Sequence, residues 1–468
     1  DDGQKAMLKK AYQNFINLDD NSPLIREFEN FKNENQYWLE KDSLFEAAAV
    51  ENNSEDMNTW SQRDQNVFAS ANGDKQRISE LLQTEDEDGD NVVNFNEFVQ
   101  FIADKQQKES KEKFHAQGIE IYGDCLIGFS QKDFWAHKSA FYPNYEFGCE
   151  IGDGKHSCWS PAINFNDLHG EAGKLLYEKF NLYFKRYDGV RVDAAWQFIN
   201  PLICEPEYIN GQPAFDDKGN KLGHPISNQP QVANNGTYII KDIILKAAKD
   251  NNVSPNKILL EMLGGNSYNS LDAVKNLGPQ LIHITRYGSE GWGRVKYYES
   301  HGENKYQNLK PGDYIIGPGT HDDYSLIEQS KSHDAKGRTG YLSQDLHLNK
   351  HELDGNEKKL AGAIFAELFT TSNQFATLPD IIGSERRINQ PNTSEGNWAY
   401  RTSQDFEKQY FSNLAQEKGL NAPDAMSKAL KAKHNGQSSQ ITDKLDKYAS
   451  ILRENGPMTT KDADKLYK

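Results

Sequence analysis

Four short hydrophobic segments of this 468-residue chain each end in acidic residues. GIEIYGD ends at Asp124, YDGVRVD at Asp193, KILLE at Glu261, and YIIGPGTHDD at Asp322 and Asp323. The intervals of 69, 68 and 61 residues between these acids leave room for about two βα units each. A strand that delivers a carboxylate at its C-terminal end, repeated along a chain, is how a (β/α) barrel builds an active site. Carboxylates that converge from different strands indicate acid–base or nucleophilic chemistry on a sugar.

Charge and apolar pattern argue against two classes of partner. The net charge of -16 makes the chain a poor candidate for nucleic acid or an anionic membrane, because phosphate binding needs a basic surface. No apolar run approaches the length of a membrane-spanning helix. The cysteines form no CxxC pair, and free thiols in a reducing, cytoplasmic compartment are favoured over a disulfide between Cys149 and Cys158. The chain starts at Asp1 rather than Met, so we expect a processed chain or a piece of a longer one.

The pattern of apolar and polar residues changes twice along the chain. Residues 1–115 carry apolar side chains near helical spacing and predict a helical subdomain. Residues 116–415 alternate short β-branched runs with amphipathic helices, which is typical of parallel α/β architecture. Residues 416–468 are polar and predict a helical C-terminal tail.

Residues 86–97 have the spacing of an EF-hand calcium loop. Asp86, Asp88, Asp90 and Glu97 fall at loop positions 1, 3, 5 and 12, and the carbonyl of Val92 falls at position 7. The sixth position holds asparagine instead of glycine, and asparagine also tolerates the left-handed conformation needed there. The alternative is a polar loop whose acids cap the next helix. We favour a structural Ca²⁺ ion over a regulatory one, since no second loop of this kind is visible to pair with it.

Five ordered motifs carry a resemblance to a known family. They are YGDCLIGFSQKDFWAH, YDGVRVD, LLEMLGG, GTHDD and LPDIIGSERRINQPNTSEGNWAYR. Together they resemble the 4-α-glucanotransferases, the amylomaltase or disproportionating enzymes of the α-amylase clan. The similarity extends from about Asn33 to Phe411. It implies a retaining mechanism on α-1,4-glucans or maltooligosaccharides, with no cofactor for catalysis.

The resemblance also implies roles for individual residues. Asp193 matches the nucleophile, Glu261 the general acid/base and Asp322 the third carboxylate, which stabilises the distorted sugar. The residues that match substrate-binding positions are Asp124, Trp135, Arg191, His321, Asp380, Asn389 and Trp398.

The residues themselves support part of this assignment. Arg191 precedes Asp193 by two positions on one strand, so both side chains point to the same face, and the guanidinium can keep the carboxylate ionised. A retaining enzyme needs such an ionised nucleophile and a second carboxyl about 5 Å away. Transfer differs from hydrolysis in the acceptor, so aromatic acceptor sites and water exclusion decide between the two outcomes.

The implied fold is an α/β, (β/α)8-type TIM barrel, but its first two strands have no counterpart here. An incomplete barrel would expose a parallel edge. We therefore expect either a removed N-terminal segment or a partner chain to complete it, or the helical subdomain to fill the gap in a degenerate barrel. Ala194, Met262 and Asp323 also depart from the family pattern. Two alternatives to a transferase follow: an α-glucan hydrolase on the same scaffold, and a calcium-binding, catalytically inactive glucan-binding or partner-dependent protein.

Overall fold

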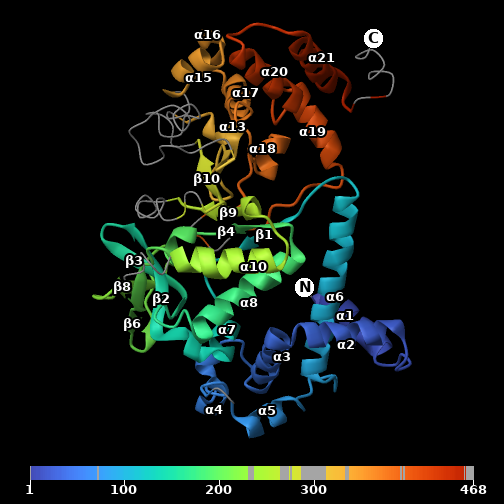
Figure 1. Cartoon of the computed structure of the whole chain (residues 1–468), viewed down its shortest axis with the longest axis vertical. Helices are drawn as coiled ribbons and strands as arrows, with labels where there is room; N and C mark the ends of the chain where they lie inside the picture. Colours follow the sequence, from blue (N-terminus) through green and yellow to red (C-terminus); the bar gives the residue numbers. More distant parts are fainter. Residues whose placement is uncertain are drawn as a thin grey trace. The chain divides into compact units, whose positions relative to one another are not determined.

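The computed structural model describes residues 2–70, 73–229, 237–263, 274, 277–285, 312–332, 337–390, 393, 396–457 and 459 (Figure 1). The chain divides into two compact units. Unit 1 comprises Asp1–Ala214 and Lys221–Lys257, and unit 2 comprises Phe215–Asn220 and Ile258–Lys468. Helices and parallel strands occur in both units, so the fold is of the α/β type.

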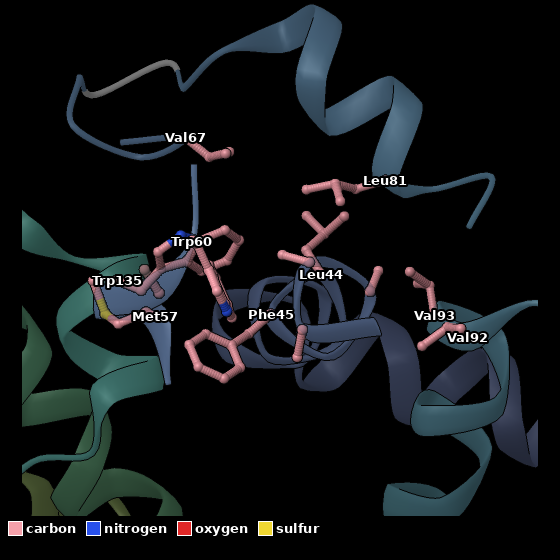
Figure 2. Close-up of a cluster of buried hydrophobic side chains, with 13 residues drawn as sticks. Leu44, Phe45, Met57, Trp60, Val67, Leu81, Val92, Val93 and Trp135 are labelled. Carbon is pink, nitrogen blue, oxygen red and sulfur yellow. The ribbon is translucent and has the colours of Figure 1, made fainter. Parts of the chain in front are cut away.

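Unit 1 begins with helices. They are α1 (Asp2–Phe15), α2 (Pro23–Glu34), α3 (Gln36–Glu51), η1 (Met57–Thr59), α4 (Gln62–Gln65), α5 (Lys75–Leu81) and α6 (Val92–His115). A core of aromatic side chains joins α1, α2, α3 and α6, and its buried members are Tyr12, Phe15, Phe28, Phe31, Leu39, Phe98 and Phe101. A second core, built around α3, receives side chains from several elements that lie far apart in the sequence (Figure 2).

Two parallel strands of unit 1 carry the first two acidic segments. In β1 (Tyr122–Cys125) and β4 (Gly189–Val192), Asp124 lies opposite Arg191. Gly189 has to be glycine, because a Cβ there would clash with the Tyr122 ring and with the backbone carbonyl of Lys257. The helix expected between the strands is α8 (Glu171–Arg186), which packs on both.

An antiparallel element that the sequence pattern did not predict accompanies these βα segments. A small closed barrel is formed by β2 (Phe141–Gly152), β3 (Lys155–Ile163), β8 (Leu222–Pro225) and β5 (Ile203–Pro206). β2 and β3 form a hairpin with several register shifts, and β5 and β8 close it from later in the chain. The remaining elements of this unit are α7 (Gln131–Ala136), η2 (Lys138–Ala140), η3 (Ala195–Phe198), β6 (Tyr208–Ile209), β7 (Gln212–Pro213), the π-helix η4 (Ile239–Ile244), α10 (Leu245–Asp250) and η5 (Pro255–Lys257).

The described part of unit 2 contains three parallel strands in the order β9 (Ile258–Glu261), β10 (Gln280–Ile284) and β11 (Tyr314–Gly317). The apolar segment around residue 360 forms the buried helix α17 (Glu357–Leu368). The polar C-terminal segment forms α20 (Ala422–Lys433) and α21 (Gln440–Asn455), which pack on each other, and α20 also packs on α17. The other helices are α13 (Leu326–Gln329), α15 (Thr339–Asp345), α16 (Lys350–Leu353), α18 (Leu378–Ile382) and α19 (Phe406–Ala415).

The described residues bear on the predictions about membrane-spanning helices and about the cysteines. Within them, no helix has both the length and the apolar character needed to span a membrane. All four cysteines lie in the described part of the chain, and each is a free thiol. Cys149 and Cys158 therefore do not form a disulfide.

Candidate active site

In unit 1, Arg191 joins the acids that end the first two strands. Its Nη1 lies 2.5 Å from Asp124 Oδ1, and its Nη2 lies 3.0 Å from Asp193 Oδ1. The contact with Asp124 follows from the strand register, and the contact with Asp193 from the two-residue period of a strand. The side chains of Arg191 and Asp193 are 18% and 29% exposed, whereas that of Asp124 is 47% exposed, so water screens the pair with Asp193 less than the pair with Asp124. Arg191 thus forms ion pairs with both acids, one at the end of each strand.

The backbone fixes Asp193 at the end of β4. The Asp193 N–H donates to the Cys125 carbonyl at 2.9 Å, which extends the ladder between β4 and β1 by one residue. Ala194, which follows, is left-handed with φ of 42°, a conformation that costs a non-glycine residue on the order of 1–2 kcal/mol. Gln197 then donates from Nε2 to the Gly148 carbonyl and accepts from the Leu202 N–H, so the segment after Asp193 is tied to the small barrel.

In unit 2, the other two predicted catalytic carboxylates follow parallel strands. Glu261 is the last residue of β9 and is half-buried. Asp322 lies five residues beyond the end of β11, where Asn389 Nδ2 donates to its Oδ1 at 2.5 Å and His321 Nε2 lies 3.4 Å from the same oxygen. Because β9 and β11 belong to one parallel sheet, Glu261 and Asp322 follow strands that end at the same edge.

An exposed tryptophan lies beside this group. The Trp398 ring is 4.9 Å from the His321 ring and 56% exposed. Its backbone is left-handed, with φ of 58°, and its N–H donates to the Ile388 carbonyl. Local strain at an exposed aromatic residue is typical of functional sites. The structure thus brings together four of the predicted residues of unit 2: His321, Asp322, Asn389 and Trp398.

Trp135, in contrast, cannot bind substrate in this structure. Its side chain is 0% exposed and lies within the second core of unit 1, next to Phe45 and Trp60 (Figure 2). The Phe68 ring also packs against it. Its Nε1 donates to the Asp64 carbonyl at 2.7 Å. Burial on α7 against the helical segment makes Trp135 a core residue, which corrects the prediction that it lines the substrate groove.

Asp380 also has a structural position. It is 4% exposed and forms a capping box with Thr377 at the start of α18, and its Oδ1 accepts from the Leu326 N–H at 2.6 Å. Burial raises the pKa of Asp380, whereas the hydrogen bonds from Leu326 and Thr377 act in the opposite direction. Its carboxylate oxygens already accept hydrogen bonds from Leu326 and Thr377, so the prediction that Asp380 contacts substrate is corrected here too. Asp323 is likewise turned inward, where it accepts from the Thr320 N–H at 2.7 Å.

The loop at residues 86–97 does not arrange its oxygens around an ion. The Lys9 ammonium contacts the carboxylates of Asp86 and Asp88, and Gln13 donates to Asp90. Val92 is the first residue of α6, so its carbonyl faces the helix hydrogen-bond ladder, and Glu97 lies further along the same helix with its side chain 12% exposed. Among the described residues, no group of three or more His, Cys, Asp or Glu side chains is placed to hold a metal ion.

A cavity of about 600 Å³ in unit 1 is lined by aromatic rings that the sequence analysis did not single out. Trp159 and Tyr208 are 42% and 57% exposed, and Trp159 stacks on the buried ring of Phe147. The aromatic lining residues are Phe129, Phe134, Tyr142, Tyr145, Trp159 and Tyr208, and amide side chains are contributed by Asn58, Gln131, Asn144 and Gln212. The aromatic content of 11% was a signal of such a surface, but composition alone could not locate it.

Comparison with known proteins identifies the family. A model of glycoside hydrolase family 77, described as 4-alpha-glucanotransferase, matches residues 2–406. The 4-alpha-glucanotransferase of Clostridium butyricum is 22% identical over 412 residues, which cover 84% of this chain and 74% of that protein. That of Streptococcus pneumoniae serotype 4 is 21% identical over 432 residues, which cover 86% of this chain and 73% of that protein.

Solved structures agree at the level of the fold. The amylomaltase from Streptococcus agalactiae, solved in complex with acarbose, superimposes with a TM-score of 0.65 at 17% identity, and covers 93% of this chain and 79% of its own. The amylomaltase from Corynebacterium glutamicum gives a TM-score of 0.57 at 15% identity, over 84% of this chain and 54% of its own. On the family match, with Arg191 and the strand-end carboxylates in place, this chain belongs to the 4-α-glucanotransferases of glycoside hydrolase family 77, enzymes that carry out transglycosylation on α-glucans.

Proposed function

We propose that this chain transfers α-1,4-glucan segments by a retaining mechanism, with Asp193 as nucleophile, Glu261 as general acid/base and Asp322 as the carboxylate that stabilises the distorted sugar. The observation that carries the proposal is Arg191, which pairs with Asp193 at 3.0 Å on a buried strand. A positive charge at this distance favours the ionised form of the carboxylate, which is the form that attacks the anomeric carbon.

The mechanism divides the reaction into two displacements. Asp193 forms a glycosyl ester while Glu261 donates a proton to the leaving sugar oxygen. Glu261 then removes a proton from the incoming acceptor hydroxyl, which attacks the ester. In this scheme Asp322, held by Asn389, makes hydrogen bonds to the donor sugar that strengthen as its ring flattens.

Transfer requires that a sugar hydroxyl reaches the ester before water does. We propose that the aromatic cavity of unit 1 holds the glucan chain and supplies this preference. The exposed rings of Trp159 and Tyr208 offer flat apolar faces to sugar rings, and the amides around them can bond to hydroxyls. Gln197 links this part of the chain to the segment that follows Asp193.

In this mechanism no step passes through a calcium ion. Lys9 already supplies a positive charge to Asp86 and Asp88, so the donor set at residues 86–97 does not fit a Ca²⁺ ion as it stands. We further propose that the parallel strands belong to a (β/α)8-type barrel, with a helical subdomain at residues 1–115 and a helical tail at residues 416–468.

Incubation with maltotriose tests the reaction. We expect glucose together with oligosaccharides longer than maltotriose from the wild type. Asp193→Asn should lose at least about 10³-fold in rate, because no ester can form. Asp217→Asn, an exposed aspartate outside the site, serves as the matched control and should behave like the wild type. Identical product profiles for Asp193→Asn and the wild type would refute the assignment of the nucleophile.

A hydrolase on the same scaffold gives a different product pattern. Maltose and glucose without longer products from the wild type would select hydrolysis. If the cavity holds the acceptor, Trp159→Ala should increase the share of hydrolysis relative to transfer without abolishing cleavage. An unchanged ratio would show that the acceptor binds elsewhere.

A further inference from the structure

The segment Arg387–Asn389 holds Asp322 from two sides in unit 2. The Asn389 N–H donates to the His321 carbonyl at 3.1 Å, and its side chain donates to Asp322 Oδ1 at 2.5 Å. Arg387 donates from Nη2 to the main-chain carbonyl of Asp322. One short segment therefore contacts the main-chain carbonyls on both sides of the Asp322 Cα and one oxygen of the carboxylate.

Arg387 is itself fixed in place. Its guanidinium carbon lies 4.6 Å from the centroid of the Tyr324 ring, two residues beyond Asp322. Its Nε is buried and has no hydrogen-bond partner among the described residues. The guanidinium therefore leaves its Nε–H without a hydrogen bond in the position from which Nη2 donates to Asp322. This arrangement depends on the planar fork of arginine, which stacks on the ring and donates along its edge, as lysine cannot.

The Asp322 side chain needs such support. It is 43% exposed and follows a loop, so nothing in its secondary structure limits its rotamer. A carboxylate that acts on the transition state has to be held within about 0.5 Å of its working position. We propose that Arg387 is a positioning residue for Asp322: it fixes the main chain that carries the carboxylate, while Asn389 fixes the carboxylate itself.

This inference rests on the proposed role of Asp322 in the transfer reaction. It predicts that loss of Arg387 acts on the transition state more than on substrate binding. Arg387→Met should lower kcat by about 10- to 100-fold with a KM close to that of the wild type. Arg387→Lys keeps the charge but loses the stacked fork, and should fall between the two.

The neighbouring Arg386 offers a matched control. It is exposed, and its guanidinium carbon lies 5.9 Å from the Tyr400 ring centroid, away from Asp322. Arg386→Met removes the same charge and side chain at the adjacent position. It should keep the wild-type kcat, which separates the position of the guanidinium from the loss of net charge.

A double-mutant cycle with Asp322→Asn distinguishes positioning from a structural role. If Arg387 acts through the Asp322 carboxylate, Arg387→Met should have no further effect on the residual kcat of Asp322→Asn. The inference would be overturned if Arg387→Met lowered kcat by the same factor in the wild type and in Asp322→Asn. It would also be overturned if a lower melting temperature accounted for the lost activity of both Arg387 variants. An inactive wild type would refute the proposed function, whereas an active wild type with an equally active Arg387→Met would refute this inference alone.

Discussion

Replacement of Trp135 tests directly whether this residue belongs to the core or to the substrate site. Trp135→Ala removes a fully buried indole from contact with Phe45, Trp60 and Phe68. Truncation of a buried tryptophan costs about 3–5 kcal/mol, and the Asp64 carbonyl that loses its donor adds about 1 kcal/mol. Natural domains are stable by roughly 5–15 kcal/mol, so we expect Trp135→Ala to unfold at much lower urea concentration or not to fold.

Trp135→Phe keeps a ring in the core and allows activity to be measured. It loses the hydrogen bond to Asp64 and part of the ring contacts, so we expect a destabilisation of about 1–2 kcal/mol in urea unfolding. Its KM for maltotriose should remain within about twofold of the wild-type value, because no substrate reaches the ring.

The same substitution at an exposed ring provides the contrast. Trp398→Phe changes a side chain that is 56% exposed beside His321, and we expect a raised KM with little loss of stability. If Trp135→Phe instead kept wild-type stability and raised KM by about tenfold, the indole would contact substrate and the core assignment would be wrong.

Three other perturbations have defined outcomes. Arg338 and Glu367 form an ion pair at 2.9 Å with side chains 2% and 3% exposed, so Arg338→Met should cost about 3–5 kcal/mol in urea unfolding, and unchanged stability would contradict a buried pair. At Asp188, burial raises the pKa, but hydrogen bonds from His115 and a backbone N–H outweigh it and bring the pKa to about 2. The depressed pKa stabilises the folded state above the unfolded pKa near 4, and this stabilisation is lost as the pH falls toward 2. In Asp188→Asn the free energy of unfolding should therefore fall less steeply between pH 4 and pH 2, and an identical pH dependence would refute the role of Asp188. Because Lys9 contacts the acids at residues 86–97, the melting temperature should be the same in calcium and in chelator, and a rise with calcium would show that the ion displaces the lysine.

Several features of the site could be predicted because they depend on neighbouring residues. A run of apolar residues that ends in an acid places the carboxylate at a strand end in β1, β4 and β9. The two-residue period of a strand aims Arg191 and Asp193 at the same face, and the ion pair between them follows. Periodicity likewise predicted amphipathic helices between the strands, of which α8 is one.

Other features depend on contacts between distant segments, which local patterns do not encode. The EF-hand spacing at residues 86–97 is present, but Lys9, far away in the sequence, contacts two of its acids. The hairpin of β2 and β3 becomes a closed barrel only when β5 and β8, at least 40 residues later, pair with it. Arg387 resembles any surface arginine in the sequence, and only the fold brings it to the Asp322 carbonyl.

The sequence alone thus determined that Arg191 and Asp193 pair at a strand end, because a carboxylate at a strand end and an arginine two residues away are properties of one short segment. The tertiary structure decided which aromatic and acidic residues are available to a sugar. Trp135 and Asp380 belong to motifs similar to those of the family, yet both are buried and bonded to backbone groups, while Trp398 and Trp159 remain exposed. Burial depends on what packs against a side chain, and those partners come from segments far away in the sequence.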